Sequence, residues 1–140
     1  MFITGGSNKV IQLWDDRKLK VPQHSFEGHT GEIYGLQWAP FNKSVFASCS
    51  EDRRVIIWDE SRIGKEQTPE EAEDGPPELL FIHGGHCSKV MDISWNLGDE
   101  WVLASIADNG ENGDLQIWQP ASHIVDEEGS ENSHEEEELE

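Results

Sequence analysis

The chain has 140 residues and a formal net charge of −19 at pH 7, which leaves room for about one domain and disfavours direct binding to the phosphate backbones of nucleic acids. Fifteen acids lie in two runs without Lys or Arg, residues 66–78 and 126–140, so a basic protein is the expected partner, with a solvated tail as the alternative for the terminal run. Only two cysteines are present and no apolar stretch is long enough to span a membrane, so we expect a soluble intracellular protein without a disulfide framework.

The sequence contains a repeat with a period in the low forties. Trp14-Asp15 and Trp58-Asp59 are 44 residues apart, whereas Gly28-His29 and Gly85-His86 are 57 apart. Removing an insertion of roughly 16 residues from the second interval restores the shorter period, which is the blade period of a WD40 propeller.

Short apolar runs between turns of Gly, Asn, Asp and Pro indicate strands rather than helices. Residues 2–14 supply only the end of a blade, with residues 23–26 as its outer strand. The two following units have expected strands at residues 33–38, 45–49 and 55–58, and at 90–95, 101–105 and 115–118. We therefore predict an all-β fold with about two and a third propeller blades in residues 1–120, followed by an acidic tail at 121–140 that we expect to be disordered.

Polar side chains of each blade are spaced to form one hydrogen-bonded chain that holds the strands in register. In the complete blade the set is His29, Ser48, Asp52 and Trp58. The last unit has His86, Ser105 and Trp118, with Asp108 and Asp114 as alternatives for the turn carboxylate because residues 109–113 lengthen the loop. We interpret these residues as structural rather than catalytic.

Residues 62–82 are the one long interruption of the repeat, and residues 62–78 of it are expected to form a loop. The segment is first acidic, then broken by Gly75-Pro76-Pro77, and finally apolar at residues 79–82. Alternate residues of a strand face opposite sides, so four consecutive apolar residues place some of them on the outer face. An apolar surface rimmed by carboxylates suits a basic amphipathic helix.

The inserted segment also carries a family resemblance. Residues 24–27, 52–54 and above all 63–86 resemble the C-terminal third of the nuclear histone-binding WD40 proteins, the retinoblastoma-binding and chromatin-assembly small-subunit group, and the match extends over nearly all of residues 2–120. The resemblance implies a seven-bladed nuclear propeller without catalytic activity. It implies a histone-binding scaffold subunit of chromatin assembly, deacetylase, acetyltransferase, remodelling or Polycomb-type complexes.

The resemblance implies two binding sites. Family members bind the first helix of histone H4 in a groove between the acidic Pro-Pro loop and an N-terminal helix. The corresponding acids here are Glu71, where the family usually has Asp, and Asp74, and the apolar floor corresponds to Leu79, Leu80, Phe81 and Ile82. A second, axial patch takes basic peptides such as the histone H3 tail, and it corresponds to Glu32, Tyr34, Lys89 and Asp108. Ordinary loop and strand-start positions are the alternative for Glu32 and Tyr34.

Other chemistries have weaker support in the sequence. His83 and His86 with Cys87 have a thinkable zinc spacing, but no second pair of Cys or His accompanies them. No Gly-rich phosphate loop precedes a helix, and no Ser lies in a nucleophile elbow. We therefore expect no metal, no cofactor and no enzymatic activity. The alternative to histone binding is a truncated or degenerate propeller fragment that acts only as a structural protein-protein interaction module.

Overall fold

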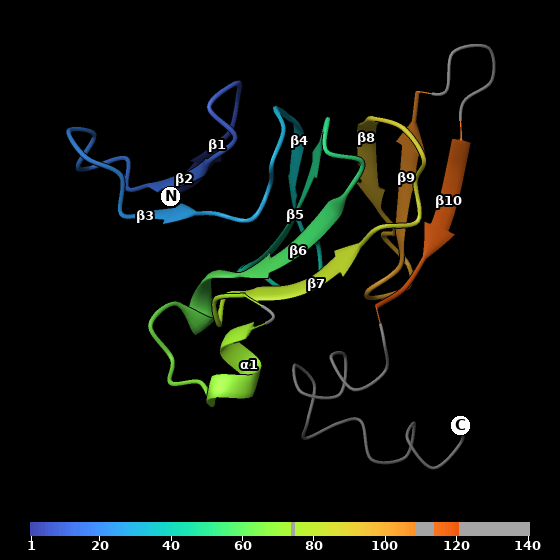
Figure 1. The fold of residues 1–140 in the computed structure, drawn as a ribbon. Coiled ribbons are helices and arrows are strands. Elements are labelled where there is room, and N and C mark those ends of the chain that lie inside the picture. Colours follow the sequence, from blue (N-terminus) through green and yellow to red (C-terminus); the bar gives the residue numbers. More distant parts are fainter. Residues whose placement is uncertain (74, 109–113, 121–140) are drawn as a thin grey trace.

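The computed structural model describes residues 1–73, 75–108 and 114–120. Within them, ten strands form three antiparallel sheets of three, four and three strands (Figure 1). The first sheet contains β1 (Phe2–Thr4), β2 (Ile11–Trp14) and β3 (His24–Phe26); the second contains β4 (Ile33–Trp38), β5 (Val45–Ser50), β6 (Val55–Asp59) and β7 (Leu79–His83); the third contains β8 (Val90–Trp95), β9 (Leu103–Ala107) and β10 (Asp114–Trp118). The predicted all-β fold is confirmed, with strands paired in chain order in every sheet.

Consecutive sheets lie face to face, and the second sheet is covered on both sides. One buried cluster lies between the first and second sheets and includes Phe26, Phe46, Ile56 and Trp58. The other lies between the second and third sheets, where β4 and β5 approach β8, and includes Ala47, Val55, Ile57, Ile93 and Leu103. Every residue of β5 and β6 is therefore buried, as expected for strands with two covered faces.

The sequence repeat is also a repeat of backbone conformation. Lys9 and Arg53 occupy equivalent positions in the β1–β2 and β5–β6 turns, and both have positive φ values, 68° and 72°. The preceding residues, Asn8 and Asp52, accept hydrogen bonds from the backbone two residues further on, at Val10 and Arg54. The polar residue before the left-handed position therefore stabilises the same turn in both sheets.

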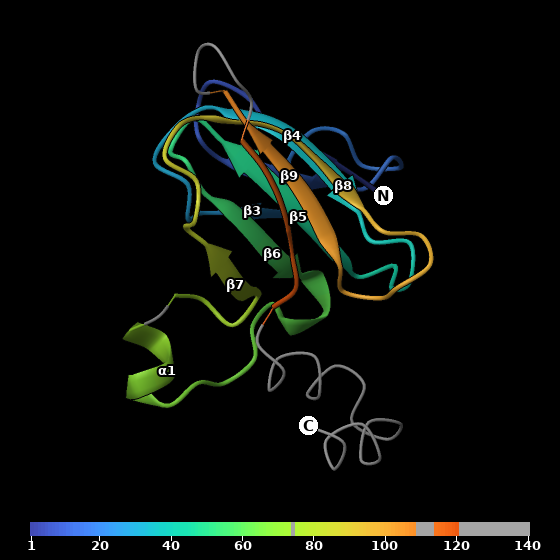
Figure 2. The ribbon, with the colours of Figure 1, turned by 90° about the vertical axis from the view of Figure 1, so that its right-hand side faces the viewer.

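Two details differ from the sequence prediction. The expected strand at residues 101–105 begins only at Leu103, because Trp101 lies in a turn with a φ of 67°. The inserted segment also contains a short helix, α1 (Pro69–Glu73), instead of loop alone, and a 3-10 turn, η1 (Glu60–Arg62), ends at its first residue. In Figures 1 and 2, α1 projects from the sheet beside β7. Neither of the helices described is long and apolar enough to cross a membrane.

Candidate functional site

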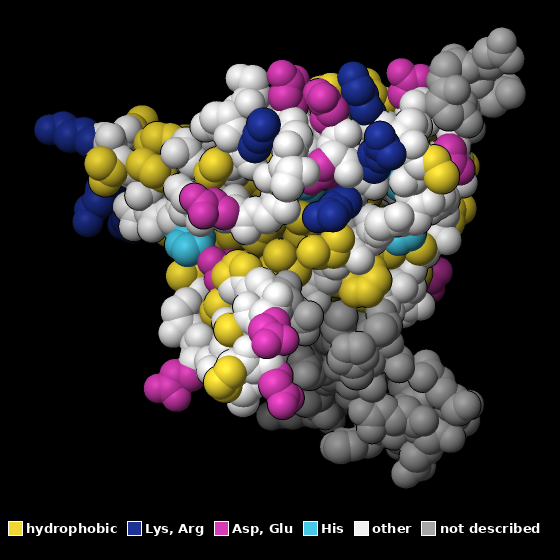
Figure 3. Space-filling view, viewed as in Figure 1, with side chains coloured by type: hydrophobic (Ala, Val, Ile, Leu, Met, Phe, Trp, Pro, Cys, Tyr) yellow, Lys and Arg dark blue, Asp and Glu magenta, His cyan; other side chains and the backbone are white. Residues whose placement is uncertain are grey.

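A groove of about 300 Å³ lies between the loop part of the inserted segment, within residues 62–78, and β7. Its lining residues are Gln67, Glu71, Gly75, Pro76, Leu79, Leu80, Phe81 and Ile82. Five of the six residues predicted for the histone H4 site are thus brought together, and the sixth, Asp74, lies outside the described residues. Figure 3 shows acidic side chains on the lobe formed by the inserted segment and hydrophobic side chains where this lobe meets the sheets.

The acidic wall of the groove is held in place by local hydrogen bonds. The backbone N–H of Thr68 donates to Glu71 Oε2, and the backbone N–H of Glu71 donates to Thr68 Oγ1, each at 3.2 Å. This reciprocal pair is a capping box, and Pro69 at the first helical position suits the start of α1. Gln67 Nε2 donates to the carbonyl of Gly75 at 3.0 Å and closes the segment on itself. The Glu71 carboxylate is therefore presented at the rim by a defined backbone.

The apolar floor owes its shape to an irregularity in β7. The register with β6 shifts between Ile57 and Trp58, where the paired residues change from Phe81 to Leu79. Leu80 is thereby left out of the ladder, and a bulge of this kind re-aims neighbouring side chains. As a result, Leu80 and Phe81 both pack against the cluster between the second and third sheets.

The floor is only partly available to a ligand. Leu79 packs against the cluster between the first and second sheets, and the ring of Phe81 lies 5.8 Å from that of Trp118. Ile82 has the most open side chain of the four, with 37% of its surface exposed. This geometry is consistent with the sequence prediction that some of residues 79–82 face outward. Among the four residues, only Ile82 is exposed, and the other three are half-buried.

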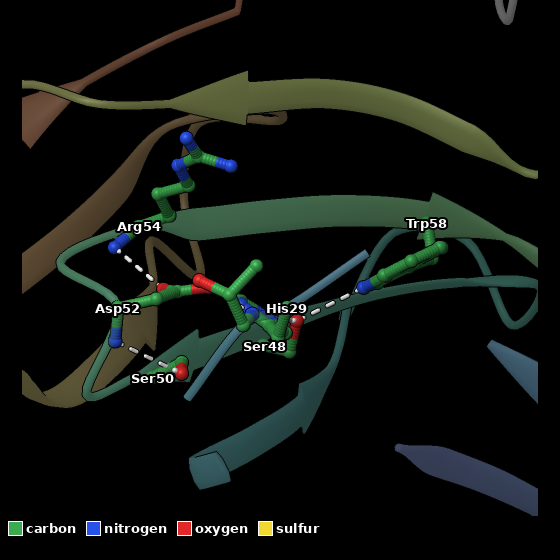
Figure 4. A network of polar contacts seen from close by, with 7 residues as sticks. His29, Ser48, Ser50, Asp52, Arg54 and Trp58 are labelled. Carbon is green, nitrogen blue, oxygen red and sulfur yellow. Dashed lines mark hydrogen bonds and ion pairs between the residues drawn. The ribbon is translucent and has the colours of Figure 1, made fainter. Parts of the chain in front are cut away.

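The predicted polar chain of the complete blade is present as one network (Figure 4). His29 Nδ1 lies 2.8 Å from Asp52 Oδ2, and His29 Nε2 lies 2.6 Å from Ser48 Oγ. Trp58 Nε1 donates to the same Ser48 oxygen at 2.9 Å. Burial alone would raise the pKa of Asp52, but hydrogen bonds, first from His29 and then from backbone N–H groups, lower it. The network links a loop, two strands and a turn of the second sheet.

The third sheet repeats this network with Asp114 in the carboxylate position. His86 Nδ1 lies 3.0 Å from Asp114 Oδ2, and His86 Nε2 lies 2.6 Å from Ser105 Oγ. Trp118 Nε1 donates to Ser105 Oγ at 2.9 Å. Of the two sequence alternatives, the structure therefore places Asp114 rather than Asp108 beside the histidine.

Sequence reasoning missed an extension of this network to the second sheet. His83 Nε2 lies 2.7 Å from Gln116 Oε1, and Gln116 Nε2 donates to Asp114 Oδ2 at 3.0 Å. The His83 ring also stacks on Trp118, with centroids 4.1 Å apart. Burial lowers the pKa of His83, and the neighbouring His86 adds to this effect while the contact with Gln116 opposes it. No motif in the sequence signals these contacts, because they join residues of different repeat units.

The four predicted axial residues lie in two equivalent places. In the second sheet, the Glu32 carbonyl accepts from the Glu51 backbone N–H at 2.9 Å, and the Tyr34 hydroxyl donates to Glu51 Oε2 at 3.1 Å. Partial burial and then the hydrogen bond to Glu51 raise the pKa of Tyr34. In the third sheet, the backbone N–H of Asp108 donates to the Lys89 carbonyl at 2.9 Å. Glu51 is a further carboxylate at this face that the sequence prediction did not include.

Metal binding has no site in the part of the chain that the structure describes. No group of three or more His, Cys, Asp and Glu side chains there is arranged to hold an ion. The rings of His83 and His86, the residues considered for zinc, are 5.6 Å apart and are engaged in the network of the third sheet.

Comparisons with known proteins agree with this architecture. The family model described as WD domain, G-beta repeat matches residues 20–59 and 77–119, which together are more than half of the chain. Histone acetyltransferase type B subunit 2 of Candida glabrata is 37% identical over 124 residues, covering 89% of this chain and 29% of the relative. The protein of the same name from Debaryomyces hansenii is 38% identical over 123 residues, covering 83% and 29%.

The chain thus spans less than a third of the length of these relatives, which fit the group of histone-binding WD40 proteins that the sequence resembles. A chain in the solved structure "Crystal Structure of Mitotic Checkpoint Complex" superposes with a TM-score of 0.66 over 86% of this chain and 33% of its own length. Its sequence identity is 19%, so this likeness concerns the fold alone. The repeat, the sheets and the matched family model together show that the chain belongs to the WD40 repeat family.

Proposed function

We propose that this chain is part of a non-catalytic, nuclear, histone-binding scaffold subunit, and that its groove binds the first helix of histone H4. The observation that carries the proposal is one groove that combines an acidic rim at Glu71 with an apolar floor at Leu79–Ile82. The names of the two relatives, which are subunits of a histone acetyltransferase, support an assembly with chromatin-modifying subunits. The acidic and aromatic residues Glu32 and Tyr34, with Glu51, are proposed to take a basic peptide such as the histone H3 tail.

The rim and the floor contribute differently to binding. Exposed ion pairs are each worth only about 0.2–1 kcal/mol, so the carboxylates orient and attract a basic helix more than they hold it. Full burial of a side chain such as Ile contributes about 1.5–3 kcal/mol. Because Ile82 is already 63% covered in the free protein, given its 37% exposure, a ligand adds about a third of that, or about 0.5–1 kcal/mol. Affinity therefore comes from several modest contacts.

The test of the rim uses charge reversal in the native full-length gene product, with a fluorescent H4 first-helix peptide as probe. Glu71→Lys combined with Asp74→Lys should weaken binding by about 2- to 30-fold, which corresponds to the loss of two ion pairs worth about 0.2–1 kcal/mol each. Glu70→Lys combined with Glu73→Lys makes the same change in net charge on exposed residues that do not line the groove, and should have a smaller effect. Glu71→Gln distinguishes the loss of the negative charge from the loss of the capping hydrogen bonds, because Gln can still complete the capping box with Thr68.

The test of the floor uses two truncations of matched size. Ile82→Ala should weaken peptide binding by about 2- to 5-fold. Ile106→Ala removes the same atoms from a 44% exposed residue of the third sheet and should leave binding unchanged. The groove is not the H4 site if the wild-type protein does not bind the peptide. The same conclusion follows if the control variants, at Glu70 and Glu73 and at Ile106, lose as much affinity as the groove variants.

A further inference from the structure

Glu78 is buried, whereas Glu66, Glu70, Glu71 and Glu73 of the same acidic run are exposed. Only 5% of its surface is exposed, although acids are rarely buried unless a partner compensates the charge. The partner is His24, whose Nε2 lies 2.5 Å from Glu78 Oε2. His24 belongs to β3 of the first sheet, whereas Glu78 directly precedes β7 of the second. The pair therefore joins the end of the inserted segment to the neighbouring sheet.

Backbone contacts fix the same point of the chain. The Asp59 N–H donates to the Glu78 carbonyl at 2.8 Å, and the Leu79 N–H donates to the Pro76 carbonyl at 3.0 Å. Glu78 thus lies inside a tight turn between Pro76 and Leu79, and both of these residues line the groove. The Glu78 side chain therefore lies between groove residues on either side of it in the chain.

The His24 side of the pair is equally well supported. Its ring packs edge-on against Phe26, with centroids 4.8 Å apart, and Phe26 in turn packs against Trp58. Leu79 packs against the cluster that contains both of these aromatic residues. His24 is therefore positioned by the same buried cluster that supports the groove floor, and it provides a rigid anchor for the Glu78 carboxylate.

We propose that His24 and Glu78 are positioning residues of the helix-binding groove, which set the place of the inserted segment without contacting the ligand. The proposal rests on the function proposed above. Neither residue lines the groove, so the effect on a ligand is indirect. A sheet that contributes no groove residue would then control the affinity of a site on its neighbour.

The test compares Glu78→Ala, His24→Ala and the double variant in the native full-length gene product. Two readouts are measured: the Kd for the H4 first-helix peptide, and the rate of trypsin cleavage after Arg62 and Lys65 in the ligand-free protein, followed site by site by mass spectrometry. Each single variant should weaken binding by about 2- to 30-fold and speed cleavage, and the double variant should be no worse than a single one. Glu27→Ala, which removes an exposed acid near the same strand, is the control for lost charge.

The conservative variant Glu78→Gln separates positioning from simple stability. Its amide can still bond to His24, so it should recover most of the affinity and slow cleavage, even where urea unfolding shows the alanine variant to be destabilised. Wild-type cleavage rates in both alanine variants would overturn the proposal. So would additive losses in the double variant. Failure of the wild-type protein to bind peptide would overturn the H4 assignment instead, and the cleavage experiment would still decide whether the pair holds the segment.

Discussion

Replacing Ser48 with Ala removes a single hydroxyl group, and we expect this change to destabilise the fold strongly. The Ser48 hydroxyl accepts from Trp58 Nε1 and lies 2.6 Å from His29 Nε2, so it joins two side chains that depend on it. Ser48 and Trp58 are fully buried, and His29 is 8% exposed. A buried polar group that loses its partner costs about 1–3 kcal/mol, so two such groups predict a loss of about 2–6 kcal/mol in the free energy of unfolding.

Ser105→Ala provides the matched comparison in the third sheet. Ser105 is also fully buried and makes the corresponding contacts with His86 and Trp118. Trp118 is only partly buried, however, so its indole N–H can turn to water more readily than that of Trp58. One orphaned group instead of two predicts a smaller loss, about 1–3 kcal/mol.

Urea unfolding of the two variants and the wild type in the full-length protein measures both losses, with the midpoints compared at equal slope. Ser48→Cys is a useful third variant, because a thiol fills the space but is a weak hydrogen-bond partner. A Ser48→Ala loss below about 0.5 kcal/mol, or a loss no larger than that of Ser105→Ala, would refute the reasoning from buried partners.

Three further predictions concern other parts of the described structure. Gly31→Ala should destabilise the protein by about 1–3 kcal/mol in urea unfolding, because an added Cβ would lie 2.8 Å from the backbone nitrogen of Asp52. Burial lowers the pKa of His83, so below about pH 6.5 the unfolded chain binds more protons than the folded one, and stability falls as the pH is lowered. His83→Gln should reduce that loss of stability in thermal melts recorded from about pH 7.5 to about pH 5. Burial, with smaller contributions from nearby acids, raises the pKa of Cys49 to about 12, so iodoacetamide at pH 7.5 should label the exposed Cys87 and leave Cys49 unmodified until unfolding.

The fold was predictable because its signals are local and repeated. The spacing of the Trp residues and the Gly-His pairs defined the repeat units, and alternation within each unit located the strands. The network of His29, Ser48, Asp52 and Trp58 followed from the same spacing. The spacing did not identify the carboxylate of the third sheet. Asp114 lies four residues before Trp118, whereas Asp52 lies six residues before Trp58, so the two positions do not correspond in the sequence. Only the structure distinguishes Asp114 from Asp108 there.

Contacts between sheets were beyond the reach of such reasoning. His24 and Glu78 are 54 residues apart, and His83 and Gln116 are 33 apart, so neither pair has a fixed place in the repeat. Burial of Glu78 was also unexpected, because a sequence window counts it with the exposed acids around it. Helix α1 was also unexpected. It has only five residues and depends on its capping hydrogen bonds, because helix propensity alone would not sustain so short a helix.

The position of the groove follows from the way in which the three sheets are packed. The inserted segment leaves the second sheet after β6 and returns at β7, so both of its ends are attached to the sheet that, among the three described, is covered on both faces. A long excursion is tolerated there because β6, the strand that precedes it, is fully buried between the two clusters, whereas Ile63 and Leu79 of the segment add only partly buried contacts. The same arrangement keeps the ends of the segment close together while its acidic helix extends outward. In the proposed helix-binding groove, the packed sheets thus supply the rigid support, and the inserted segment supplies the charged rim.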